Sequence, residues 1–242
     1  MDNAVALVQS YLRVNGYLTV TEYPVVEAVP APHGGFQAAT DLDVLAFRFG
    51  HSCTLMPERG GVNGSPDGAT CPVETDPALD VRPGVPDMII GEVKEGRATL
   101  NRAATNPNVL AAAITRFGCC EPEHAADLVK RLIRDGHAMT HHGHSPHRVR
   151  LVAFGALPPE TASRVGGRFQ VVLLGDIVAF LRDHIRRHWA RLQASECKDP
   201  GLGFLMTLEK AERGRKAPSV PGKAAPSLSH QPRHLEKRDI HA

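Results

Sequence analysis

A short segment with apolar residues on both of its faces sets the architecture expected of this chain. Residues 86–96 read PDMIIGEVKEG, and Met88, Ile89 and Ile90 leave neither face of a strand polar. A strand of this kind is buried in a sheet that is covered on both sides. The segment therefore predicts a central strand and an α/β fold, in which helices flank a mixed sheet.

The residues before this segment predict one helix and two strands. Residues 2–15 carry apolar side chains at helical spacing and stop at Asn15-Gly16, and residues 16–29 are rich in β-branched and aromatic types. Residues 40–50 alternate and predict a second strand, antiparallel to the first. The alternation predicts two faces for this strand: Leu42, Val44 and Ala46 lie on one, and Asp41, Asp43, Leu45 and Phe47 lie on the other.

The residues after the central segment predict a helical crossover and more strands. We expect helices over 107–117 and 122–135, strands over 147–156 and 169–175, and a helix over 176–194. The order helix, three strands, helices, strands, helix predicts one domain over 1–212. Residues 51–85 are a long loop or insertion, and the basic, Pro/Ser-rich segment 213–242 is expected to be a disordered tail.

Composition places the chain among ordinary globular proteins and gives no strong sign of a partner. Hydrophobic residues make up 42% and the net charge is +2. The N-terminus predicts a helix and not a signal peptide. The longest apolar run is interrupted by Asp176 and is shorter than the roughly 20 residues of a membrane span. With five cysteines and no sign of secretion, we expect a cytoplasmic protein with reduced thiols and no membrane association.

Two carboxylates and a lysine form the arrangement with the clearest chemistry. Glu92 and Lys94 are two residues apart on one strand, so their side chains leave the same face. Asp43 lies in the middle of the preceding predicted strand. If these strands pair, Asp43 and Glu92 can share a divalent cation, while Lys94 offsets the charge that develops in phosphodiester hydrolysis.

The residues around this trio resemble a known nuclease signature. TDLDVLAF (40–47) followed by IIGEVKEG (89–96) is similar to the paired strands of PD-(D/E)xK nucleases, the restriction-endonuclease-like superfamily, and above all to its Holliday-junction-resolvase-like members. The similarity covers about residues 2–95 and extends more loosely over 147–192. It implies a restriction-endonuclease-like αβββαβ core and an Mg²⁺- or Mn²⁺-dependent nuclease.

The resemblance also implies roles for individual residues. Asp43 and Glu92 correspond to the metal-binding carboxylates, Lys94 to the lysine that orients or activates the attacking water, and the backbone carbonyl of Val93 to a further metal ligand. Asp41 and Gln9 are candidates for auxiliary roles. Asp41 shares the parity of Asp43, and Gln9 stands on the first helix, where many relatives place an acidic residue.

Two similar patterns in the chain are interpreted as unrelated to the site. Asp87, of a literal Pro-Asp pair, precedes Glu92 by five residues, so strand parity directs it to the opposite face, about 16 Å along the strand. A second Glu-x-Lys, Glu196-Cys197-Lys198, follows a long helix and lacks an apolar lead-in. It is interpreted as a helix end.

Histidines, cysteines and arginines elsewhere support weaker hypotheses. The segment 137–147 holds five histidines and follows Cys119-Cys120, but adjacent cysteines rarely chelate one ion together and Cys53 and Cys71 stand alone. A solvated polar loop is the favoured interpretation, with a zinc-stabilised interaction domain as the weaker one. On the last predicted helix, four arginines are candidates for phosphate contacts or for a solvated face: Arg182, Arg186, Arg187 and Arg191.

The sequence therefore favours a metal-dependent nuclease that acts on DNA in preference to RNA, in repair, recombination or genome defence. The alternative from another class is a catalytically silent module with the same fold that binds nucleic acid or a protein. Homodimerisation is left open.

Overall fold

A mixed sheet of six strands forms the centre of the molecule. The computed structural model describes residues 2–32, 34–57, 68–140, 146–160, 168–194 and 196–216. The strands of the sheet are β1 Leu18–Ala28, β2 Phe36–Arg48, β5 Asp87–Arg97, β6 His137–Met139, β7 Arg148–Leu157 and β8 Gln170–Leu173.

The order of the strands places β5 in the interior of this sheet. The sheet runs β1-β2-β5-β7-β6, and β8 pairs with β7 outside this path. The β1–β2 and β2–β5 pairs are antiparallel, whereas β5 and β7 are parallel. The predicted α/β class with a mixed sheet is confirmed, as is the antiparallel pairing of the first two strands.

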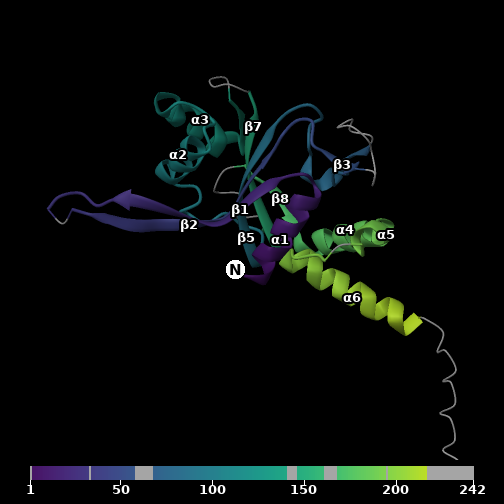
Figure 1. The fold of residues 1–242 in the computed structure, drawn as a ribbon. Helices are drawn as coiled ribbons and strands as arrows, with labels where there is room; N and C mark the ends of the chain where they lie inside the picture. Colours follow the sequence, from purple (N-terminus) through teal and green to yellow (C-terminus); the bar gives the residue numbers. More distant parts are fainter. Residues whose placement is uncertain are drawn as a thin grey trace, which may run out of the picture.

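Helices cover both faces of the sheet. They are α1 Asn3–Val14, α2 Pro107–Arg116, α3 Pro122–Asp135, α4 Leu174–Arg187, α5 Trp189–Leu192 and α6 Pro200–Lys216. Helices α1, α4 and α6 pack on one face with Ile89 of β5, and α2 and α3 pack on the other with Met88 and Ile90 (Figure 1). Because neighbouring residues of β5 enter different cores, the strand is buried on both sides, as its sequence predicts.

The first helix shows how local sequence signals position these layers. Asp2 caps α1 by accepting a hydrogen bond from the Ala4 N–H at 3.1 Å. Val8 and Leu12 are fully buried against the sheet. The helix ends before Asn15, and Gly16 has a φ of +86°, a conformation that glycine adopts without strain. Helix α1 therefore turns directly into β1.

The structure differs from the sequence-based expectation in its connections. The insertion over 51–85 contains a hairpin of β3 Cys53–Pro57 and β4 Gly68–Pro72, followed by the short helix η1 Pro77–Leu79. The helix expected over 176–194 is divided at His188 into α4 and α5.

Helix α6 corrects the boundary of the expected tail. Residues 213–216 belong to α6 and were expected to be disordered, so that part of the prediction is wrong. The reason is that α6 packs Leu202, Leu205 and Met206 into the core between the sheet and helices α1 and α4 (the α1/α4 core). The folded domain therefore continues past residue 212. The rest of the predicted tail, 217–242, lies outside the described residues. Within the described part of the chain, no helix combines the length and apolar character needed to cross a membrane.

Candidate functional site

The pairing of β2 with β5 brings the three predicted site residues to one place. Val44 lies opposite Gly91, and the same antiparallel register places Asp43 next to Glu92. Glu92 has the strand parity of Met88 and Ile90, so it points toward the face that α2 and α3 cover. The Lys94 amine forms an ion pair with Glu92 Oε1. Asp43, Glu92 and Lys94 therefore converge where the β2–β5 ladder ends.

Glu92 is a buried carboxylate with one oxygen left open. Its side chain is 1% exposed, and Oε1 accepts hydrogen bonds from Lys94 and from the Asn101 amide, the latter at 2.7 Å. Oε2 is buried and has no hydrogen-bond partner. Burial raises the pKa of Glu92 above its usual range, and the Asp43 charge adds to this, whereas Lys94 and Asn101 act in the opposite direction. An open oxygen of this kind calls for an explanation such as an ion.

Asp43 holds its carboxylate at the edge of β5. Its Oδ2 accepts a hydrogen bond from the Val93 N–H at 2.8 Å, in the place where a ladder partner would stand. Across from it on β1, Glu22 has a φ of +53° and lies between the pairs Thr21–Val44 and Tyr23–Leu42. Such strained residues in a strand often occur at functional sites.

The irregularity at Glu22 also corrects the predicted faces of β2. Val44 packs in the α1/α4 core, whereas Leu42 packs in the α2/α3 core with Leu45. The expected grouping of Leu42 with Val44 and Ala46 is therefore wrong. The change of face falls at Asp43, across from the left-handed Glu22 of β1, and backbone irregularities of this kind redirect side chains.

The lysine and the supporting amide come from β5 and the segment that follows it. The Lys94 side chain is 39% exposed, so its amine lies between the buried Glu92 and solvent. Asn101 stands in the connection between β5 and α2. Its Oδ1 accepts from the Ala104 N–H at 2.5 Å, which leaves its amide N–H free to face Glu92. Sequence reasoning missed Asn101, because an asparagine in a loop carries no signal of its own.

The remaining predicted ligands lie close to this trio or on neighbouring elements. Val93 is the residue whose N–H binds Asp43, and in an extended strand the carbonyl of a residue leaves toward the same neighbouring strand as its N–H. Asp41 is exposed on β2, opposite Pro24. Gln9 is buried on α1. The roles expected for Val93, Asp41 and Gln9 stay predictions.

Asp87 belongs to a separate, structural network on the other face of β5. It is 1% exposed and binds Arg148 at 2.7 Å and Arg150 at 2.6 Å. It also accepts a hydrogen bond from the Tyr17 hydroxyl. Both carboxylate oxygens are used in these contacts. Asp87 therefore anchors β5 to β7 and to the start of β1.

The arginines of α4 and α5 are largely engaged with acidic residues. Arg187 pairs with Asp183 at 2.8 Å, one helical turn away. Arg186 pairs with Glu209 of α6 at 3.2 Å, and Arg182 pairs with Glu212. These contacts fasten α6 to α4 and reduce the positive charge available to a nucleic acid. The role expected of Arg182, Arg186, Arg187 and Arg191 in nucleic-acid binding stays a prediction.

The described parts of the histidine-rich segment are integrated into the fold. His147 is 6% exposed, its N–H donates to the Thr140 hydroxyl at 2.9 Å, and its ring packs on Phe47. His141, His142 and His144 lie outside the described residues. Cys119 is buried, and burial raises the pKa of its thiol to about 12, which disfavours the thiolate that binds metal.

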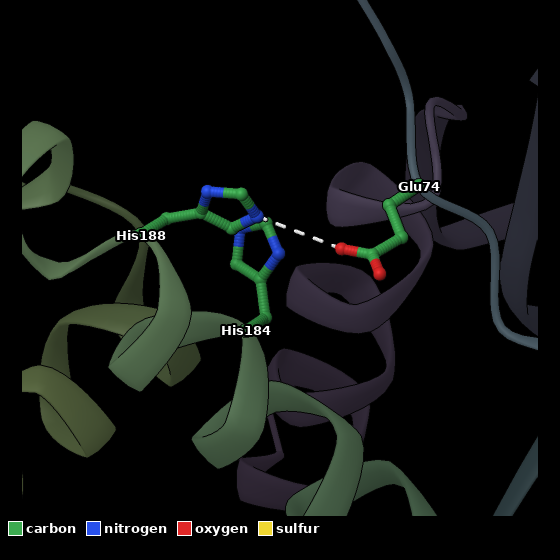
Figure 2. A group of neighbouring side chains, drawn as sticks. All are labelled: Glu74, His184 and His188. Carbon is green, nitrogen blue, oxygen red and sulfur yellow. Dashed lines mark ion pairs between the residues drawn. The ribbon is translucent and has the colours of Figure 1, made fainter.

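A different group of metal-binding residue types stands at the end of α4. Glu74, His184 and His188 each present one ligand atom, and these atoms lie within 4.8 Å of one another (Figure 2). Sequence reasoning missed this group, although His184 and His188 have the i, i+4 spacing that places two ligands on one face of a helix. The third member, Glu74, follows the insertion hairpin and has no sequence signal linking it to α4.

Comparisons with known proteins add no family. No protein-family model matches the chain, and neither a curated protein nor a solved structure is significantly similar to it.

Proposed function

We propose that this chain is an Mg²⁺- or Mn²⁺-dependent nuclease with a restriction-endonuclease-like core, which hydrolyses phosphodiester bonds in DNA during repair, recombination or genome defence. The observation that carries the proposal is the buried, unpartnered Oε2 of Glu92 beside Asp43. An open carboxylate oxygen next to a second carboxylate is a suitable ligand set for a hard divalent cation.

The residues present fit such an ion. Asp43 and Glu92 offer carboxylate oxygens from two adjacent strands, and the Val93 carbonyl is the further oxygen ligand in this proposal. All three are oxygen donors, which Mg²⁺ and Mn²⁺ prefer. When bound, the ion would stabilise negative charge on the phosphate and lower the pKa of a bound water.

The side chains around the ligands have distinct tasks in hydrolysis, which joins a water oxygen to phosphorus and breaks one P–O ester bond. The Lys94 amine is held by Glu92 and is partly exposed, so it can orient the attacking water and offset negative charge on the phosphate. Asn101 holds Glu92 through Oε1 and leaves Oε2 without a partner, so Oε2 would be the oxygen that binds the ion.

Cleavage assays with matched variants test this proposal. Purified full-length protein is incubated with duplex, nicked, branched and single-stranded DNA, and with RNA, in Mg²⁺, Mn²⁺ or EDTA. We expect cleavage of at least one DNA form in Mg²⁺ or Mn²⁺ and none in EDTA. Asp43→Asn, Glu92→Gln and Lys94→Met should each reduce cleavage by at least about 100-fold, and the triple variant by little more, because members of one catalytic unit are non-additive.

The second Glu-x-Lys supplies the control. Lys198 is exposed in the connection between α5 and α6, so Lys198→Met should leave cleavage unchanged. Cleavage that persists in EDTA, or that survives Asp43→Asn and Glu92→Gln, would contradict the assignment. DNA binding in EDTA without cleavage in either metal would identify a silent binding module instead.

A further inference from the structure

A second site, away from β5, gathers two imidazoles and a carboxylate. His184 and His188 lie one turn apart at the end of α4, and their ring centroids are 4.6 Å apart. Glu74 reaches them from the segment between β4 and η1, and its Oε2 lies 3.5 Å from His188 Nε2. Figure 2 shows both rings on the same side of the helix, with the carboxylate facing them.

The buried histidine of this group has a polar atom that the fold does not use. His184 is 7% exposed, and its Nδ1 is buried without a hydrogen-bond partner. Its ring lies nearly parallel to the ring of Phe180, with the two centroids 6.4 Å apart. Burying an unpaired ring nitrogen lowers stability. The neutral ring is nevertheless suited to one partner, a metal ion that accepts its lone pair.

We infer that Glu74, His184 and His188 form a binding site for a transition-metal ion of the Zn²⁺ class. Two imidazoles and one carboxylate are the protein ligands of open zinc sites, in which a water takes the fourth position. Imidazole nitrogen favours Zn²⁺, Co²⁺ or Ni²⁺ over Mg²⁺, so this site and the all-oxygen site at Glu92 select different ions. The inference does not depend on the proposed nuclease activity.

The surroundings hold the ligands without occupying them fully. Arg187 donates to Glu74 Oε1 and leaves Oε2 on the side of His188. Asp76, two residues after Glu74, is fixed to α1 because its carboxylate accepts from the Tyr11 hydroxyl at 2.8 Å and its N–H donates to Asn15 Oδ1 at 2.6 Å. Such outer contacts orient metal ligands in known sites.

A metal ion at this site would join the 51–85 insertion to helix α4. Without the ion, Glu74 is joined to α4 through exposed or half-exposed pairs with Arg187 and His188. Such pairs are worth little. The three ligand atoms already lie within 4.8 Å of one another, and side-chain rotation at the exposed Glu74 can bring its carboxylate to the ion.

Metal titration of the full-length protein tests the inference. Protein stripped with EDTA and then dialysed is titrated with Zn²⁺ by calorimetry, and with Co²⁺ by visible absorption. We expect one tight equivalent of Zn²⁺, a rise in the melting midpoint, and a Co²⁺ spectrum with d–d bands but no thiolate charge-transfer band. Tight binding should be lost in His188→Ala and in Glu74→Gln, each by more than the roughly 10–100-fold typical of outer contacts.

Three controls keep the result interpretable. Glu74 is exposed and His188 is only half-buried, so both variants should retain the melting midpoint of metal-free wild type. His137→Ala removes an exposed histidine of the histidine-rich segment and should bind Zn²⁺ normally, as should Glu92→Gln. Tight Zn²⁺ binding that persists in both His188→Ala and Glu74→Gln, a thiolate band, or no tight binding in wild type would overturn the assignment.

Discussion

Two buried carboxylates on one strand, Asp87 and Glu92, are treated very differently by the fold. Both are 1% exposed, and they lie on opposite faces of β5. Asp87 has both oxygens bound by Arg148, Arg150 and Tyr17. Glu92 has one oxygen bound and one open, and its pKa is raised mainly by burial.

The charge of Asp87 is satisfied at both carboxylate oxygens, whereas the charge of Glu92 is satisfied at one oxygen only. A buried charge is tolerated when partners satisfy it, as the two arginines do for Asp87. An unsatisfied buried charge lowers stability, and natural proteins accept that loss mainly where a ligand or a reaction needs the group.

The largest expected effect is on stability, at Asp87. Asp87→Asn removes the negative charge that two buried arginines share, and breaking a buried ion pair by removing one partner is unfavourable by about 3–5 kcal/mol. We expect a drop of that size in the free energy of unfolding, measured in urea at neutral pH.

Asp80 is the matched control, because it binds Arg148 from the solvent side and its side chain is 71% exposed. Asp80→Asn should change stability by no more than about 1 kcal/mol. Equal effects of the two changes would show that burial does not distinguish them.

A smaller effect is expected on metal affinity, at Asn101. This amide binds Glu92 at 2.7 Å and does not belong to the proposed ligand set. Asn101→Ala should weaken Mg²⁺ or Mn²⁺ binding by about 10–100-fold, as changes of outer contacts do, with little change in melting midpoint. Mn²⁺ affinity can be followed by electron paramagnetic resonance. Asn106→Ala is the control, since Asn106 caps α2 through the Asn108 N–H and does not contact Glu92. Unchanged Mn²⁺ affinity in Asn101→Ala would remove Asn101 from the site.

The features that depend on strand periodicity can be predicted from the sequence. The apolar residues of β5 predict a central strand, and parity correctly separates Asp87 from Glu92 because the pairing of β5 is regular there. The same reasoning fails at Leu42, which packs in the other core from Val44, next to the left-handed Glu22 of β1. The sequence gives no sign of a left-handed residue there, because glutamate rarely adopts a positive φ and so does not indicate one.

Contacts between distant segments are the part that the sequence cannot give. Asn101 and Glu74 both stand in loops, and their roles arise only from where those loops pack. Helix α6 was missed because it follows the loop residues Cys197 to Asp199 and opens with Pro200-Gly201, and because its burial depends on α1 and α4. His184 and His188 form an i, i+4 pair in the sequence, but such a pair can equally stand on a solvated helix face. Only the burial of His184 in the structure distinguishes this pair from that case.

The smallest expected effect has the opposite sign to that at Asp87. In EDTA at neutral pH, Glu92→Gln should raise the free energy of unfolding, by about 1 kcal/mol, because it removes a charge that burial disfavours. Because the folded pKa of Glu92 is raised, the folded state binds this proton more tightly than the unfolded state does. That contribution to stability is present below the unfolded pKa and is lost as pH rises through the folded pKa. Wild type should therefore lose stability relative to Glu92→Gln over this pH interval, and the difference between the two proteins should stay constant above it.

Chemical denaturation of both proteins in EDTA, repeated from pH 4 to pH 8, measures this difference in the free energy of unfolding. With Mg²⁺ added, wild type should gain stability and the variant should not, so the order of the two can reverse. If Glu92→Gln were instead destabilised in EDTA as strongly as Asp87→Asn, Glu92 would be a structural acid like Asp87, and the open oxygen would lose its meaning as a ligand.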